Sequence, residues 1–184
     1  MIIELLFTTI LFLEVFVIIF VIISIIAPNR RFWPPPSRNS WKFYFFWAGF
    51  YYGLITFIIL GILGWNSSNT FLMLRIITGG SLFFAGSLIF IWGVATLKLN
   101  RTFGLKGNKI ISSGPYKFSR NPQYLGLFIF ISGYIILTSS ILILISGILG
   151  IILFIPFPFS EEPWLKQQFG KEYDDYCKKV RRFI

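Results

Sequence analysis

The chain has 184 residues, of which 55% are hydrophobic and only 13% charged, and its formal net charge at pH 7 is +10. Soluble domains carry about a quarter charged residues, so this composition predicts an integral membrane protein. The sequence contains no histidine, which excludes histidine-based catalysis and metal binding through imidazole, and its single cysteine excludes an internal disulfide. The basic residues lie between apolar segments, so we expect membrane lipids as partners, and no nucleic acid and no metal.

Three long apolar segments fill the first half of the chain. Each has roughly the 20 residues needed to cross a bilayer, and we predict spans at Ile3 to Ala27, Phe43 to Gly64 and Phe71 to Leu97. A basic, proline-containing loop, Asn29 to Lys42, follows the first span, and a polar turn, Trp65 to Thr70, follows the second.

The second half begins with a long polar stretch, Lys98 to Pro122. Gln123 to Ser160 is apolar and is interrupted only at Thr138 to Ser140, which predicts a hairpin of two short spans. Glu161 to Ile184 is charged and predicts an amphipathic cytoplasmic helix. The fold class is therefore an all-α membrane protein with five transmembrane helices. We expect residues 1–97 to supply three of them and residues 98–184 to form one catalytic unit.

The distribution of Lys and Arg predicts the orientation of these spans. Four lie in the first loop, six in the Lys98 to Pro122 loop and six in the tail; only Arg75 lies elsewhere. Basic loops stay on the cytoplasmic side, so the N-terminus is expected outside and the C-terminus in the cytoplasm.

Two features inside the spans have both a structural and a functional interpretation. Glu14 lies in the middle of the first span, where a carboxyl group indicates either a functional site or a structural residue that is protonated or bonded to a Ser or Thr hydroxyl. Gly49 and Gly53 have the spacing of closely packed membrane helices, and we interpret them as an intramolecular contact.

The polar stretch before the hairpin contains turn and helix-start signals. Gly114-Pro115 predicts a turn, and Pro122 suits the first turn of the following helix, with Asn121 held outside it. Arg120 and the backbone N–H groups of this helix start would favour an anion. The alternative is an ordinary basic loop beneath the lipid headgroups.

In the tail, Ser160 is expected to cap a helix whose first turn carries Glu161 and Glu162. Six residues follow helical spacing on one face: Glu162, Leu165, Phe169, Tyr173, Tyr176 and Val180. This face either rests on the membrane surface or binds a cationic, aromatic ligand. Gly170 within it indicates a bend or a close approach.

These two stretches resemble the signature of the isoprenylcysteine carboxyl methyltransferase and phospholipid methyltransferase superfamily. The first reads Gly114-Pro115-Tyr116, then Arg120-Asn121-Pro122-Gln123-Tyr124-Leu125-Gly126. After the apolar hairpin, the second reads Glu161-Glu162, Leu165, Phe169-Gly170, Tyr173 and Tyr176, and ends in basic residues. Many members have histidine where this chain has Asn121, and a proline where it has Arg181.

The resemblance implies that S-adenosylmethionine is the cofactor and that a lipophilic acceptor enters from the bilayer. One wall of the cofactor pocket would be formed by Gly114, Pro115, Tyr116, Arg120, Asn121, Pro122 and Tyr124. The other would be formed by Glu161, Glu162, Leu165, Tyr173 and Tyr176. Of these, Glu161 or Glu162 would meet the positive charge of the cofactor, and Arg120 would orient an anionic acceptor. Arg120 and Glu162 are the expected catalytic residues.

Two other functions remain open. Reductases of isoprenoid or sterol double bonds resemble the same C-terminal half and use a nicotinamide cofactor there, although they are usually longer. A non-enzymatic membrane protein with a lipid-binding tail is the third possibility. The acceptor itself, whether a prenylcysteine-like carboxylate, a lipid or a thiol, is not determined by the sequence.

Overall fold

The computed structural model describes residues 1–66 and 71–183, and this part of the chain is helical with no strand. In chain order the helices are α1 (Ile2–Ile26), η1 (Pro28–Arg30), α2 (Trp41–Leu63), α3 (Leu72–Leu97), α4 (Leu99–Thr102), η2 (Gly114–Lys117), α5 (Pro122–Thr138), α6 (Ile141–Phe154), α7 (Phe157–Phe169) and α8 (Lys171–Lys179). The prediction of an all-α protein is confirmed. The expected turn at 65–70 lies mostly outside the described residues.

Four helical segments in the described part of the chain are long and apolar enough to cross a membrane. They are α1, α2, α3 and the stretch Ile141–Phe169, which contains α6 and α7. The helix α5 is apolar but has only 17 residues. The predicted boundaries of the first three spans agree with the structure to within two residues.

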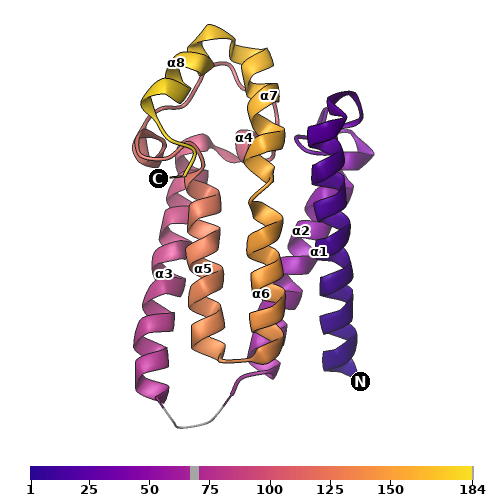
Figure 1. The fold of residues 1–184 in the computed structure, drawn as a ribbon, viewed down its shortest axis with the longest axis vertical. Coiled ribbons are helices and arrows are strands. Elements are labelled where there is room, and N and C mark those ends of the chain that lie inside the picture. Colours follow the sequence, from indigo (N-terminus) through magenta and orange to yellow (C-terminus); the bar gives the residue numbers. More distant parts are fainter. Residues whose placement is uncertain (67–70, 184) are drawn as a thin grey trace.

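The predicted hairpin is present. Helices α5 and α6 run antiparallel and are joined at Ser139 and Ser140, where Ser139 adopts a left-handed conformation (φ 49°). Helix α5 also lies along most of the length of α3 (Figure 1). The guanidinium of Arg75 in α3 donates to the carbonyls of Leu137 and Thr138, both at 3.1 Å, and so satisfies the C-terminal end of α5.

The contact between α3 and α5 depends on glycines spaced seven residues apart. Gly79 and Gly86 of α3 lie against Gly133 and Gly126 of α5, respectively. A Cβ added at Gly79 would lie 2.6 Å from the backbone nitrogen of Leu137 and 2.9 Å from the carbonyl oxygen of Gly133. The two backbones therefore touch, which is how membrane helices pack closely without a hydrophobic driving force.

The other half of the bundle is formed by α1, α2 and α6, whose buried side chains meet α5 at the centre. The buried core residues are Ile10, Phe57, Leu60, Ile131, Tyr134 and Ile143. The Tyr134 hydroxyl donates to the carbonyl of Ile58 at 2.7 Å, which satisfies this polar group inside the bundle.

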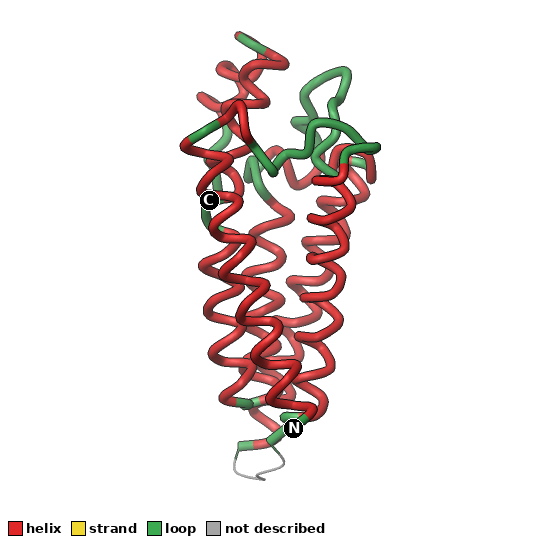
Figure 2. Tube along the Cα trace, turned by 90° about the vertical axis from the view of Figure 1, so that its right-hand side faces the viewer, coloured by secondary structure: helices red, strands yellow, loops and turns green. Residues whose placement is uncertain are grey.

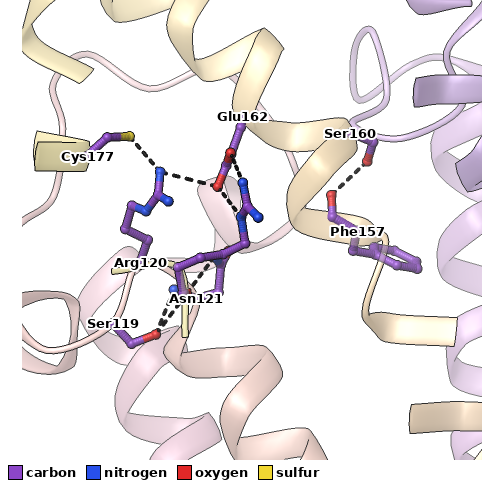
Figure 3. Close-up of polar contacts among 8 residues, drawn as sticks. Ser119, Arg120, Asn121, Phe157, Ser160, Glu162 and Cys177 are labelled. Carbon is purple, nitrogen blue, oxygen red and sulfur yellow. Dashed lines mark hydrogen bonds and ion pairs between the residues drawn. The ribbon is translucent and has the colours of Figure 1, made fainter. Parts of the chain in front are cut away.

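The tail differs from the prediction in two respects. Helix α7 begins at Phe157, and Ser160 is not its cap: the Ser160 hydroxyl lies inside the first turn and donates to the Phe157 carbonyl at 2.8 Å (Figure 3). Proline suits a first helical turn because it lacks the N–H that would go unpaired there, and Pro156 and Pro158 set this earlier start.

The tail is also two helices and not one. Gly170 has φ +53° and separates α7 from α8, so the residues predicted to share one helical face lie on two helices joined by a bend. The expected bend at Gly170 is confirmed. Helices α7 and α8 and the loops before α2 and α5 gather at one end of the bundle, opposite the N-terminus (Figures 1 and 2).

Candidate functional site

A cavity that opens to solvent lies at the end of the bundle where the loops and the tail meet. Its walls come from five parts of the chain: the loop before α2, the end of α3 with α4, the loop before α5, the start of α5, and the helices α7 and α8. The two stretches that the sequence singled out therefore meet in space, as predicted.

Nine of the twelve predicted cofactor residues line this cavity. They are Tyr116, Arg120, Asn121, Tyr124, Glu161, Glu162, Leu165, Tyr173 and Tyr176. The bend at Gly170 does not remove α8 from the site, because Tyr173 and Tyr176 face the same cavity as Glu162 and Leu165 of α7.

The other three predicted residues shape the wall without lining it. Gly114 has φ +56° and begins the turn η2, and a Cβ there would lie 2.9 Å from the hydroxyl of Thr96 in α3. Pro115 is buried in that turn, and Pro122 occupies the first turn of α5 with Asn121 as its N-cap, as expected.

Glu161 is held by two donors from distant parts of the chain. The indole N–H of Trp33, in the loop before α2, donates to its Oε1 at 2.6 Å, and the Tyr124 hydroxyl donates to the same oxygen. Both donors use one oxygen, so the second oxygen of the carboxylate remains available to a ligand. Trp33 is itself buried, packed against Phe46 and Phe157.

Glu162 belongs to an ion cluster with two arginines. The Arg182 guanidinium binds it in a bidentate manner, with two N–O distances of 2.8 Å, and Arg120 Nη1 lies 3.2 Å from Oε1 (Figure 3). Arg120 Nη1 also donates to the Cys177 sulfur at 2.6 Å. Both carboxylate oxygens of Glu162 are thus occupied by cations of the chain, whereas those of Glu161 are not.

The end of the tail docks on the residues before α5. The backbone N–H of Arg120 donates to the carbonyl of Arg181 at 2.9 Å. The Ser119 hydroxyl and the Asn121 side-chain amide both donate to the carbonyl of Arg182, at 3.2 and 3.0 Å. Asn121 therefore acts as a hydrogen-bond donor that closes the cavity at this point.

The tyrosines tie α8 to the turn η2. The Tyr176 hydroxyl donates to the Tyr116 carbonyl at 2.8 Å. Burial raises the pKa of Tyr116, Tyr173 and Tyr176 above the ordinary value for tyrosine. These phenols therefore stay protonated at neutral pH and keep their capacity to donate.

Several lining residues were not predicted from the sequence. Trp33 and Pro34 come from the first loop, which carries no motif, and Gly104 and Gln168 lie outside the residues that the resemblance assigns to the pocket. Gly104 has φ +74°, and a Cβ there would lie 2.8 Å from Pro35 and 3.1 Å from the Trp33 ring. The feature of the sequence that could have indicated this position is the glycine itself, because a left-handed backbone and a close approach of two segments both favour glycine.

Three buried polar atoms in the cavity wall have no hydrogen-bond partner in the described part of the chain. They are both side-chain amide atoms of Gln168 and Nε of Arg120. Buried polar groups are normally paired, so these atoms indicate groups that a ligand would satisfy. The described residues contain no cluster of three or more metal-ligating side chains.

Comparison with known families agrees with the resemblance found in the sequence. The family model for phospholipid methyltransferase matches residues 74–172, more than half of the chain, from α3 into the start of α8. No curated protein and no solved structure matched the chain. The matched region contains the α3–α5 contact, the loop before α5 and both glutamates of the cavity, and the predicted resemblance is confirmed: this membrane-helix protein belongs to the phospholipid methyltransferase family.

Proposed function

We propose that this protein is an S-adenosylmethionine-dependent methyltransferase that methylates a lipophilic acceptor reached from the bilayer. One observation carries the proposal: in a chain of a methyltransferase family, the buried carboxylate of Glu161 lines the cavity between the loops and the tail, and one of its oxygens has no hydrogen bond from the described residues.

The residues of the cavity suit this cofactor. S-adenosylmethionine carries a sulfonium cation, an amino group, a carboxylate and an aromatic base. Glu161 would face a positive charge, the unpartnered Gln168 amide and Arg120 Nε would meet polar groups, and Trp164 and the tyrosines offer ring faces. Of the two glutamates expected to meet the cofactor's charge, this proposal assigns that role to Glu161 and not to Glu162, because two arginines already neutralise Glu162.

The cofactor, when bound, supplies an electrophilic methyl group and leaves as a neutral thioether. The chain then has to position the partners and exclude water, and this needs no titrating base when the acceptor is an ionised carboxylate. Arg120 lies 13% exposed in the cavity wall, where its guanidinium can orient an anionic acceptor. An amine or a thiol acceptor is compatible with the same positioning role.

We further propose five membrane spans, in which α5 crosses the membrane in addition to the four long apolar segments. Its 17 residues extend about 25 Å at 1.5 Å per residue, which is near the thickness of the hydrocarbon core, and α3 covers it along this length. Apart from Arg75, every Lys and Arg lies in the two predicted basic loops or the tail at the cavity end, which supports a cytoplasmic position for this end and an outside position for the N-terminus. Helix α8 would lie on the headgroups as an amphipathic helix, with Tyr173 buried and Lys178 and Lys179 exposed.

Calorimetric titration of the purified protein tests the cofactor assignment. S-adenosylmethionine and its demethylated product, S-adenosylhomocysteine, are expected to bind, and NADPH is not. Glu161→Gln keeps an oxygen that accepts from Trp33 and Tyr124 but removes the charge. It should weaken binding of S-adenosylmethionine about tenfold or more, and binding of the product less, because the thioether is uncharged.

Glu172→Gln is the matched control, since Glu172 is exposed on α8 and lies outside the cavity wall. Equal binding by Glu161→Gln and Glu172→Gln would remove Glu161 from the site. Failure of the folded protein to bind either adenosyl compound would contradict the methyltransferase function, and binding of NADPH instead would favour a reductase.

A further inference from the structure

A second cavity lies inside the bundle between α1, α2, α5 and α6. It is lined by aliphatic and aromatic side chains and by glycines of α2 and α6. Among the described residues that line it, only Glu14 and Ser146 carry polar side chains. The Ser146 hydroxyl already donates to the Leu142 carbonyl at 2.9 Å, so Glu14 is the principal polar feature of this cavity.

A layer of aromatic rings separates this cavity from the cofactor cavity. Trp33 and Tyr124 line the cofactor cavity, whereas Phe46, Phe154 and Phe157 line the second one. Trp33 stacks on Phe46 with ring centroids 4.2 Å apart, and the ring of Tyr124 lies 5.7 Å from that of Phe157. The second cavity is therefore a separate site, and a ligand there does not presuppose methyl transfer.

The carboxyl group of Glu14 is buried in the cavity wall without a partner. Its side chain is 7% exposed, and its Oε2 has no hydrogen-bond partner in the described part of the chain. None of the ion pairs of the described residues involves it. No hydroxyl or cation of the described residues bonds to it, since the Ser146 hydroxyl in the same wall donates to Leu142. Even as a neutral, protonated group, the carboxyl would keep hydrogen-bonding capacity that these residues leave unused.

The wall opposite Glu14 leaves space for a ligand. A Cβ added at Gly150 of α6 would still lie 3.4 Å from Glu14 Oε1, which is ordinary contact. Gly49 and Gly53 of α2 face Leu13, where a Cβ would come within 3.3 Å, so this pair brings α1 and α2 close together, as expected. The glycines thus bring the helices together while the cavity beside Glu14 stays open.

We propose that this cavity binds an apolar molecule that carries one hydrogen-bond-donating group, a hydroxyl or a primary ammonium, and that this group donates to Glu14. The apolar walls receive the hydrocarbon part of the ligand. The donor satisfies the carboxyl group, which is the one strongly polar group in the wall. A ligand with no donor gains nothing from Glu14 and leaves it unpaired.

Photolabelling of the full chain in lipid nanodiscs tests this proposal. Three photoactivatable alkyl probes of equal length would be compared, ending in a hydroxyl, a primary amine or a methyl group. The hydroxyl or the amine probe is expected to label the cavity-lining segments of α1, α2 and α6 about tenfold more than the methyl probe. Equal labelling by all three probes would overturn the proposal.

Two variants of Glu14 identify the ligand group. Glu14→Met removes the acceptor at similar length and should reduce labelling by the polar probes to that of the methyl probe. Glu14→Gln keeps an acceptor but not the charge, so it should retain labelling by an alcohol and lose labelling by an amine. Unchanged labelling of Glu14→Met by both polar probes would also overturn the proposal.

Thermal unfolding separates this binding role from a structural one. Because Glu14 has no partner in the described part of the chain, Glu14→Met should unfold in the absence of probe at the same temperature as the parent protein or higher. A markedly lower unfolding temperature would show that Glu14 stabilises the bundle, and would contradict a ligand-binding role.

Discussion

The glycine contact between α3 and α5 gives a sharp prediction, because neighbouring glycines in α3 face different surroundings. In Gly79→Ala the new Cβ would lie 2.6 Å from the backbone nitrogen of Leu137, which is 0.8 Å short of ordinary contact at 3.4 Å. The obstructing atoms are backbone and cannot rotate away, so the helices must move apart. In Gly80→Ala, nothing lies within 4 Å of the new Cβ.

The expected magnitudes follow from these distances. Overpacking of this kind costs about 1–3 kcal/mol, and the better helix propensity of alanine offsets up to about 1 kcal/mol of it. With the full offset, Gly79→Ala should lower the free energy of unfolding by up to about 2 kcal/mol, whereas Gly80→Ala gains the helix propensity without the clash, so the two variants should differ by about 1–3 kcal/mol. Unfolding of the two variants by heat or by denaturing detergent, followed by tryptophan fluorescence, measures the difference. Equal stability of the two variants would refute the close contact between these helices.

Two further predictions concern the cavity wall. Gly104→Ala combines a left-handed backbone with a Cβ only 3.1 Å from the Trp33 ring, so it should displace Trp33 from Glu161. Binding of S-adenosylhomocysteine should then weaken several-fold in a calorimetric titration. Unchanged affinity would mean that the loop is not part of the site. Arg182→Ala removes the partly buried bidentate pair with Glu162 and should lower the free energy of unfolding by about 1–3 kcal/mol in the same denaturation assay. Arg181→Ala should have little effect, because it keeps the backbone carbonyl that accepts from Arg120.

The hairpin and the convergence of the two motif stretches could be predicted from the sequence. The apolar run from Gln123 to Ser160 is just long enough for two antiparallel helices, which must return the chain to the side it left. This geometry is local in sequence, and it brings Arg120 and Tyr124 next to Glu161 and Glu162. The start of α5 at Pro122 was also predictable, since proline fits the first helical turn.

Other features depend on contacts between distant segments and were missed for that reason. The bond from Trp33 to Glu161 joins residues 128 positions apart, and the first loop has no pattern that predicts it. The start of α7 was placed at Ser160, because a serine before two glutamates is a strong capping signal, but Pro156 and Pro158 favoured an earlier start. The seven-residue spacing of Gly79, Gly86 and Gly93 was visible in the sequence, and its significance became clear only from the helix contact.

The location of the cofactor site can be tested directly by ultraviolet cross-linking of radiolabelled S-adenosylmethionine to the protein in nanodiscs, followed by peptide mapping. The account predicts label on peptides from the loop before α5 and from α7 and α8, which contain Tyr116, Trp164 and Tyr173, and competition by unlabelled S-adenosylhomocysteine. Label confined to peptides outside the cavity wall, or label that the product does not displace, would contradict it.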